Sequence, residues 1–235
     1  MTTAIIVAGG SGSRIGGQTP KQFLEIGGKP IIIYCMETFN HHKEIDSIIA
    51  VCQPEYMEFL HRQAKEHGIF KLQKITEAGV TRRESVLNGL KAVNGVTVTV
   101  LIHDAARPLV SEKIISDNIA AVALYGAVVT AIPAVDTMFT SQDGLYAGQP
   151  LARSGLYSAQ TPQSFRLDII MAAHLSTDGT DATDDCQLVL AIGHKVAIVQ
   201  GSEMNFKVTT SIDLDRLKAI KMHSTGVEPA AFRNV

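Results

Sequence analysis

Hydrophobic residues gather along this chain in short continuous runs, with little alternation between apolar and polar positions. The runs that are rich in β-branched residues cover 3–8, 47–52, 96–103, 126–132 and 195–200. Continuous apolar runs of this length are typical of strands that are covered on both faces of a sheet. The pattern therefore predicts buried strands at these five places.

Segments with helical spacing lie between the runs, at 29–40, 54–68, 82–93 and 111–126. Pro30 fits the first position of a helix, Gly68 a C-terminal cap and Ser111 an N-terminal cap. Strands that alternate with helices predict an α/β fold of three layers around a mostly parallel central sheet. The chain has 235 residues, which suit one sizeable core, and we expect a single domain over 1–235.

Residues 136–160 break this pattern. The segment has no helical period, alternates loosely between apolar and polar residues and contains the turn sequence QDG at 142–144. These features predict a β-hairpin arm that protrudes from the α/β body. Such an arm either closes over its own active site or grips a second subunit. The last residues, 224–235, are weakly patterned, and the sequence assigns them no role.

Composition narrows the class of protein. The formal net charge of −2 gives no overall basic field, which disfavours nucleic acid as a partner. The three cysteines, Cys35, Cys52 and Cys186, lack the spacing of a disulfide framework or a zinc site, which favours a reducing compartment. The sequence shows no secretory signal and no apolar run of about 18 residues. We therefore expect a cytoplasmic protein that binds neither nucleic acid nor membrane.

A glycine-rich loop follows the first predicted strand. Gly9, Gly10 and Gly12 precede two cations, Arg14 and Lys21. Bare glycine N–H groups let a ligand approach closely, and the cations indicate that this ligand is anionic. The loop can wrap a nucleoside triphosphate, and the alternative is a flexible surface turn with solvated cations. The third glycine comes one residue too late for the dinucleotide pattern G-x-G-x-x-G, and the phosphate-loop ending GK[ST] is absent.

Asp104 stands at the end of the third predicted strand. A carboxylate at the carboxyl end of a strand, beside a phosphate loop, is well placed to hold Mg²⁺, which prefers oxygen ligands. Arg107 lies three residues further on, so a salt bridge within the loop is the second interpretation. We expect His103 to be structural, because no second His or Cys stands at metal-ligand spacing.

Eight motifs occur in order over residues 3–217. They are AGGSGSRIG, PKQFLEIGGKPII, TRRESVLNGL, HDAARPLV, PAVDT, RSGLYSAQTPQSF, TDD (183–185) and NFKVTT. In this series the chain resembles the cytidylyltransferases that make CDP-activated polyol phosphates, and most closely those acting on 2-C-methyl-D-erythritol 4-phosphate in isoprenoid precursor synthesis. The resemblance implies a Rossmann-like fold of the nucleotide-diphospho-sugar transferase type and a homodimer joined through the arm. It also implies transfer of CMP from CTP to a polyol phosphate, with release of pyrophosphate.

The resemblance also assigns roles to matching positions. The residues that would stabilise the transition state at the α-phosphate are Arg14, Lys21 and Lys207. Asp104 would bind the nucleotide through a coordinated Mg²⁺. The other nucleotide-binding residues would be Ala8, Gly9, Gly10, Gly12, Gly79 and Ser85. The residues that would bind the polyol phosphate are Arg107, Thr137, Arg153 and Thr161. Arg153 matches a residue that reaches across the dimer from the arm.

Some of these positions also have structural interpretations. Thr137 suits a turn hydroxyl, Thr161 a residue that precedes proline, and Ser85 the first turn of a helix. The cytosine-binding loop departs from the family pattern, with Ala78 in place of a glycine and Val80 where an acidic residue is common. Any contact with the base there must come from the backbone.

The acceptor is less sharply indicated than the nucleotide. Tyr157 stands where the methylerythritol enzymes mostly have Trp, and Tyr also occurs in relatives that act on ribitol 5-phosphate. A ribitol-5-phosphate cytidylyltransferase is therefore the first alternative function. A non-catalytic nucleotide-binding regulatory domain is the second, although a pure binder has no need of transition-state cations such as Lys21 and Lys207.

Overall fold

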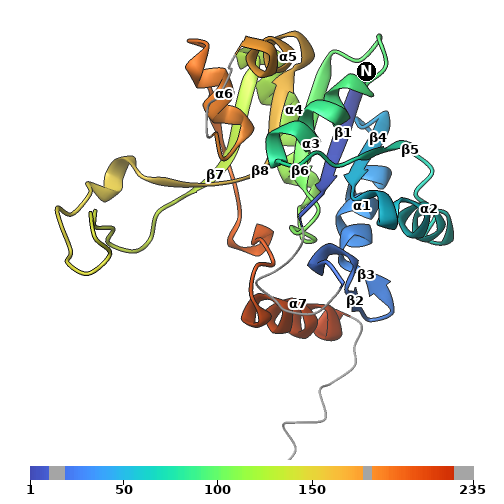
Figure 1. Cartoon of the computed structure of the whole chain (residues 1–235), viewed down its shortest axis with the longest axis horizontal. Coiled ribbons are helices and arrows are strands. Elements are labelled where there is room, and N and C mark those ends of the chain that lie inside the picture. Colours follow the sequence, from blue (N-terminus) through green and yellow to red (C-terminus); the bar gives the residue numbers. More distant parts are fainter. Residues whose placement is uncertain (11–18, 177–181, 225–235) are drawn as a thin grey trace, which may run out of the picture.

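A seven-stranded sheet forms the centre of the protein, with the strand order β5-β4-β1-β6-β8-β7-β9 (Figure 1). The structure is a computed structural model that describes residues 1–10, 19–176 and 182–224. The strands are β1 (Thr2–Ala8), β4 (Ser47–Cys52), β5 (Leu72–Glu77), β6 (Thr99–Asp104), β7 (Ala127–Pro133), β8 (Tyr157–Arg166) and β9 (Ala197–Gln200). A separate two-stranded ribbon consists of β2 (Glu25–Ile26) and β3 (Lys29–Pro30).

Helices cover both faces of the sheet. They are α1 (Ile31–His41), α2 (Met57–Glu66), α3 (Arg82–Lys91), α4 (Glu112–Tyr125), α5 (Leu167–Ser176) and α6 (Asp185–Ala191). A further helix, α7 (Ser211–Ser224), packs through Leu217 against Ile26 of the small ribbon and Ile31 of α1. One core cluster joins α1, α2 and α4 to one face of the sheet, and a second joins α3, α5 and α6 to the other. Neighbouring residues of β1 alternate between the two clusters, with Ala4 and Ile6 in the first and Ile5 in the second. The predicted three-layer α/β architecture is confirmed.

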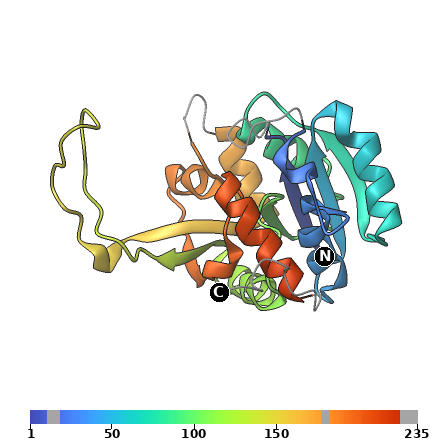
Figure 2. The same cartoon turned by 90° about the horizontal axis from the view of Figure 1, so that it is seen from below.

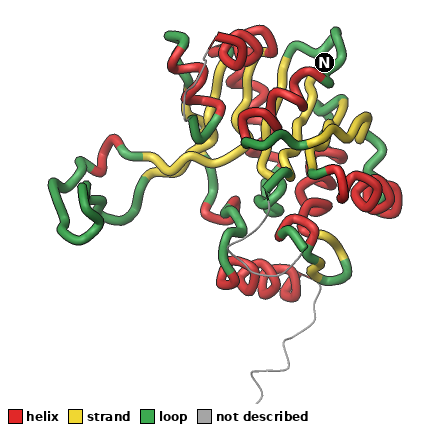
Figure 3. The backbone as a smooth tube through the Cα atoms, viewed as in Figure 1, coloured by secondary structure: helices red, strands yellow, loops and turns green. Residues whose placement is uncertain are grey.

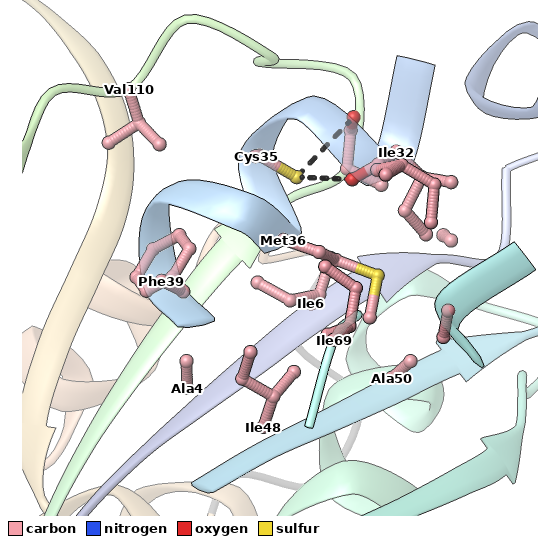
Figure 4. Packing of buried hydrophobic residues seen from close by; sticks show 14 of the residues in the cluster. Ala4, Ile6, Ile32, Cys35, Met36, Phe39, Ile48, Ala50, Ile69 and Val110 are labelled. Atoms are coloured by element: carbon pink, nitrogen blue, oxygen red, sulfur yellow. Dashed lines mark hydrogen bonds between the residues drawn. The ribbon is translucent and has the colours of Figure 1, made fainter. Parts of the chain in front are cut away.

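Small strand residues make room for the large side chains of α1 (Figure 4). Met36 and Phe39 point from α1 towards the sheet, where Ala4 of β1 and Ala50 of β4 lie in the same cluster. Both large side chains are fully buried. Each such burial contributes about 1.5–3 kcal/mol, so this close contact helps to hold α1 against β1 and β4.

All strand pairs in the central sheet are parallel except those of β8, which runs antiparallel to both β6 and β7. The five strands expected from apolar runs correspond to β1, β4, β6, β7 and β9. The apolar pattern did not reveal β8, because its buried positions include polar side chains such as Gln163 and Ser164. These find partners inside the protein: the Ser164 hydroxyl donates to Asn118 Oδ1 on α4 at 2.8 Å.

The expected helix ends are largely as the sequence indicated. The Ser111 hydroxyl accepts a hydrogen bond from the Ile114 N–H at 3.3 Å, as an N-cap does, and Gly68 has a positive φ of 66° just beyond α2. Pro30 is the exception. It precedes α1 as the N-cap and is not the first helical residue, because its extended backbone (φ −57°, ψ 140°) pairs with Glu25 in the small ribbon.

The arm leaves the body between Pro133 and Tyr157, the last antiparallel pair of β7 and β8 (Figure 2). Beyond that pair the described legs form one isolated β-bridge, Phe139 with Pro150, and scattered hydrogen bonds such as that from the Ala134 N–H to the Leu156 carbonyl. Much of the arm is drawn as loop (Figure 3). Large apolar side chains are exposed on it, including those of Val135 and Tyr146. Residues 157–160, which the sequence pattern assigned to the arm, form the start of β8. Among the described helices, none has both the length and the apolar character needed to cross a membrane.

Candidate active site

A pocket of about 680 Å³ opens beyond the carboxyl ends of β1, β4, β5 and β6. In the sheet β1 lies between β4 and β6. The chain continues from β1 to β4 and β5 on one side and returns to β6 on the other, so the order of the strands reverses at β1. Ligands of open α/β sheets bind at such a switch point. The lining residues are Val7, Ala8, Gly9, Gly10, Lys21, Gln22, Gln53, Gly79, Val80, Thr81, Arg82, Ser85, Asp104, Ala105, Ala106, Lys207 and Thr209.

Asp104 lies at the base of this pocket and is surrounded by cations. Lys207 Nζ lies 2.8 Å from Asp104 Oδ2, and Arg82 Nε lies 3.6 Å from Oδ1. Arg107 Nε is more distant, at 3.8 Å from Oδ2. The salt bridge that the sequence offered as the second interpretation, between Asp104 and Arg107, is therefore present but is the longest of the three contacts.

The charge of Asp104 is stabilised by these neighbours. Burial by itself would raise the pKa of Asp104, but Lys207 and Arg82, followed by Arg107, outweigh burial and hold the pKa well below its usual range. The carboxylate is therefore ionised at neutral pH. A buried anion among several cations can accept a cationic ligand only if one of those cations moves away, and Lys207 is the most exposed of them, with 39% of its side chain accessible.

Arg82 is a site residue that the sequence analysis missed. It lies in the first turn of α3, where a cation is unfavourable next to the positive end of the helix dipole. Two carboxylates compensate, because Arg82 Nη1 lies 2.8 Å from Asp185 Oδ2 while Nε faces Asp104. The signal was present in the motif TRRES, since a cation in a first helical turn needs an anionic partner nearby.

Gln22 is a second missed residue, and it holds the start of the glycine-rich loop. The buried Gln22 side chain donates from Nε2 to the carbonyls of Ala8 (2.6 Å) and Gly10 (2.8 Å). At Gly9, a Cβ atom would lie 2.7 Å from that of Ala78, so only glycine fits the approach of this loop to the neighbouring one. The loop thus enters the pocket with a fixed backbone at residues 8–10.

The segment 78–85 forms the opposite wall. A capping box begins α3: Glu84 N donates to Thr81 Oγ1 at 3.1 Å, and Glu84 Oε2 accepts from Thr81 N at 3.4 Å. The Ser85 hydroxyl accepts from Gly79 N at 3.0 Å and donates to the Thr81 carbonyl at 2.9 Å. A Cβ at Gly79 would overlap the Glu84 side chain. Val80 is 97% exposed, and Thr81, Arg82 and Ser85 add polar and charged side chains to this wall.

The structure brings together most of the predicted site. The residues that line the pocket are Ala8, Gly9, Gly10, Lys21, Gly79, Ser85, Asp104 and Lys207. Arg14 and Gly12 lie outside the described residues. Ser85 also occupies the first turn of α3, so its structural and ligand-facing interpretations are compatible.

Arg107 and Thr161 are buried behind the pocket. Arg107 donates from Nη1 to the Asn205 carbonyl at 2.7 Å and from Nη2 to the Ala159 carbonyl at 3.4 Å. Thr161 Oγ1 accepts from the Asp104 N–H at 3.0 Å. In this arrangement both side chains support the end of β6.

The Thr161 hydroxyl has a defined direction because of His103. Burial lowers the pKa of His103 to about 4, so its ring is neutral at physiological pH. His103 Nε2 lies 3.0 Å from the Arg107 carbonyl, which can only accept, so the ring proton is on Nε2. The other ring nitrogen, Nδ1, therefore accepts from the Thr161 hydroxyl at 3.0 Å. The structural role expected for His103 is consistent with this geometry.

Thr137 and Arg153 lie on the arm, which extends away from the body, and neither lines the pocket (Figure 2). Arg153 belongs to a short 3₁₀ turn, Arg153–Gly155, and its Nη1 donates to the Val135 carbonyl at 2.9 Å. Within one subunit the structure does not join these two residues to the rest of the site.

Among the described residues that line the pocket, Asp104 is the one that offers a carboxylate to a divalent cation. The described residues contain no group of three His, Cys, Asp or Glu side chains that could hold a metal ion. Mg²⁺ commonly binds to one or two carboxylates and completes its shell with water and substrate phosphates. The ionised Asp104 therefore fits a magnesium ion that arrives with a nucleotide.

Relatives of known name are similar to this chain over nearly all of its length. A 2-C-methyl-D-erythritol 4-phosphate cytidylyltransferase from Alkaliphilus oremlandii is 40% identical over 216 residues, which cover 91% of this chain and 92% of that protein. The bifunctional enzyme IspD/IspF of Rhodospirillum rubrum is 40% identical over 218 residues, or 92% of this chain and 56% of that enzyme. The crystal structure of 4-diphosphocytidyl-2C-methyl-D-erythritol synthase from Anaerococcus prevotii superimposes with a TM-score of 0.83 at 29% identity, covering 94% of this chain and 96% of that one.

The fold and the pocket define a nucleotide-binding α/β protein, and its relatives identify the class as the nucleotidyltransferases. The chain belongs to the 2-C-methyl-D-erythritol 4-phosphate cytidylyltransferase family, whose sequence model matches residues 2–223. The resemblance found from the ordered motifs is thus confirmed.

Proposed function

We propose that this protein transfers CMP from CTP to 2-C-methyl-D-erythritol 4-phosphate, giving 4-CDP-2-C-methyl-D-erythritol and pyrophosphate for isoprenoid precursor synthesis. The observation that carries the proposal is the pocket itself. It combines an ionised carboxylate with Lys21 and Lys207, beneath a wall of backbone groups from 78–85. Family membership supports the choice of nucleotide and acceptor.

In the proposed reaction a phosphate oxygen of the acceptor attacks the α-phosphorus of CTP. A new P–O bond forms as the bond from the α-phosphorus to the bridging oxygen of the β-phosphate breaks, and pyrophosphate leaves with that electron pair. The acceptor phosphate is already ionised, so the side chains need not remove a proton. Catalysis then consists of positioning and of neutralising charge that grows on the α-phosphate oxygens, a role for Lys21, Lys207 and Arg14.

We propose Asp104 as the ligand of Mg²⁺, which would neutralise triphosphate charge when bound. For the nucleoside, we propose that the backbone at Ala8–Gly10 and at Gly79 contacts base and ribose. The close approach of Gly9 to Ala78 and of Gly79 to Glu84 supports this, because both loops need bare backbone there. Ser85 would keep the Gly79 loop in place through its hydroxyl.

The test is an assay of pyrophosphate release with two nucleotides and two acceptors. CTP and UTP are each combined with methylerythritol phosphate and with ribitol 5-phosphate, in the presence of Mg²⁺. We expect release with CTP and methylerythritol phosphate at a kcat/KM well above the other three combinations. A preference for ribitol 5-phosphate would show that ribitol 5-phosphate is the acceptor instead of methylerythritol phosphate. Tight binding of CTP without pyrophosphate release in any combination would favour a non-catalytic regulatory domain.

We further propose that the protein is a homodimer whose arms exchange, so that Thr137 and Arg153 complete the partner's acceptor site. The exposed apolar residues of the arm support this arrangement, as does its direction away from the body (Figure 2), with no arm residue among those that line the pocket. A guanidinium can pair with a phosphate through two parallel hydrogen bonds, which suits Arg153 to the acceptor. The competing arrangement is a flap that closes over its own subunit.

A mixing experiment distinguishes the two arrangements. Arg153→Ala chains are combined with Lys21→Ala chains under conditions that allow subunit exchange. If the arm acts across the interface, each heterodimer has one site with both defects and one intact site, so activity reappears. If verified heterodimers form and no activity returns, each arm serves its own subunit.

We also propose that the protein is located in the cytoplasm. The three cysteines are all buried thiols without a disulfide, as a protein of a reducing compartment would have them.

A further inference from the structure

We propose that Asn205 is a positioning residue for CMP transfer, acting through Lys207. Together with Gln160 it would fix the backbone from which Lys207 reaches Asp104. The inference rests on the proposed function, since it explains how a transition-state cation is held. Lys207 needs such support because its side chain is long, flexible and 39% exposed.

Asn205 is fully buried and links three parts of the fold. It ends a short 3₁₀ turn, Glu203–Asn205, which follows β9. Its side-chain Nδ2 donates to Gln160 Oε1 at 3.1 Å and to the Thr161 carbonyl at 2.8 Å, both on β8. Its own carbonyl accepts from Arg107 Nη1 at 2.7 Å. One side chain and one carbonyl thus attach the turn to β8 and to the loop after β6.

Gln160 of β8 holds the same turn through the backbone of Ser202. Its Nε2 donates to the Ser202 carbonyl at 2.8 Å, and its Oε1 accepts from the Ser202 N–H at 3.3 Å. At Gly201 a Cβ would lie 2.5 Å from Gln160 Oε1, so the chain passes directly against this amide. We call the paired amides of Asn205 and Gln160 the amide clasp. All of its contacts are inside the protein, where amide hydrogen bonds are strong and their loss is costly.

Lys207 lies between two buried anchors. The amide clasp holds the chain two residues before it. One residue after it, Val208 is fully buried and its N–H donates to the Ala106 carbonyl at 2.8 Å. With both flanks fixed, the Lys207 side chain leaves the backbone at a defined point beside the pocket.

Thr161 connects this arrangement to Asp104. Its carbonyl accepts from Asn205 Nδ2, while its hydroxyl accepts from the Asp104 N–H at 3.0 Å. The backbones that carry Asp104 and Lys207 are therefore both attached to one residue of β8. Lys207 Nζ and Asp104 Oδ2, which lie 2.8 Å apart, are thus carried by backbones with a common attachment. A shift of the clasp would move the lysine relative to the carboxylate and to the α-phosphate.

The test is a double-mutant cycle between Asn205 and Lys207, with CMP transfer as the readout. Asn205→Ala should lower kcat by about tenfold to a hundredfold, since displacement by ~1 Å costs on that order, and should change the KM for CTP much less. In a Lys207→Ala background the same change should lower kcat by less than about twofold, because the residue it positions is gone.

Asn40→Ala is the matched control. Asn40 is also fully buried, and it anchors backbone far from the pocket by donating to the Gly68 carbonyl (3.2 Å) and accepting from the Lys71 N–H (3.0 Å). It should lower the melting temperature as Asn205→Ala does and leave kcat unchanged. Gln160→Met removes the other amide of the clasp while keeping a similar side-chain volume. It should cause the same loss of kcat, again only when Lys207 is present, and it replaces Asn205→Ala in the test if that variant does not fold.

Equal losses of kcat with and without Lys207 would show a general structural role and overturn the positioning proposal. So would a loss of kcat in Asn40→Ala as large as that in Asn205→Ala. Wild-type transfer with an undiminished kcat in both clasp variants would also reject it, while leaving the proposed function intact. If the wild type itself does not transfer CMP, the proposed function fails, and the positioning proposal fails with it.

Discussion

Replacement of Lys207 by alanine is expected to lower kcat by about 10²–10³-fold, with a much smaller rise in the KM for CTP. The reason is that negative charge on the α-phosphate oxygens is greater in the pentacoordinate transition state than in bound CTP, so the lysine binds the transition state more strongly. Lys21, which also lines the pocket, should show the same pattern when replaced by alanine.

Lys218→Ala is the control for this prediction. Lys218 lies on α7 in an exposed pair with Asp215, outside the pocket, so its loss should leave both kinetic constants unchanged. Steady-state kinetics with CTP as the varied substrate measure the effect. A raised KM with an unchanged kcat in Lys207→Ala would restrict this lysine to ground-state binding.

Asp104→Asn is expected to keep the fold and to reduce turnover sharply, because the amide is isosteric with the carboxylate but lacks the charge that holds a hard cation. Activity should be measured as a function of Mg²⁺ concentration, and the variant should need far more Mg²⁺ for half-maximal rate. Asp117→Asn is the control, since Asp117 pairs only with Lys113 on the exposed face of α4. Full activity of Asp104→Asn at limiting Mg²⁺ would show that Asp104 is not a metal ligand, and its role would then be the salt bridge.

The same variant should also be less stable at neutral pH. Because the folded-state pKa of Asp104 is lowered, its ionised form stabilises the fold above the unfolded pKa of about 3.9, and this contribution is lost as pH falls through the folded value. The difference in unfolding free energy between wild type and Asp104→Asn should therefore shrink on acidification. Urea titrations at pH 7 and at pH 3 measure it.

Much of the fold followed from local pattern. The apolar runs that became β1, β4 and β6 lie at the centre of the sheet, where both faces are covered, so hydrophobicity alone marks them. The strand β8 is equally central, yet its pattern is polar, because its hydroxyl and amide groups are paired with distant side chains such as Asn118. Such pairing depends on contacts between residues far apart in the chain.

The candidate site divides in the same way. Gly9, Lys21 and Asp104 were predicted because each stands in a local motif after a strand, and the carboxyl ends of parallel strands meet at one edge. Arg82 was missed although it lies within the motif TRRESVLNGL, since its importance comes from its contact with Asp185, 103 residues away in the chain. Arg107 and Thr161 were expected to contact the acceptor, and that role stays a prediction. Within this chain their side chains hydrogen-bond to the Asn205 carbonyl and to the Asp104 N–H.

Sequence alone determined the α/β class, five of the strands and several residues of the pocket, because each depends on neighbours within a few positions. The order of the strands in the sheet came only from the tertiary structure. Tertiary structure decided which charges meet. The segment after β9 is held against β8 by buried amides, and Lys207 on this segment contacts Asp104. The arm residues Thr137 and Arg153 do not line the pocket, because the arm leaves the body. The contacts of Lys207 and Asn205 join residues 103 and 45 positions apart in the chain, so no local pattern contains them.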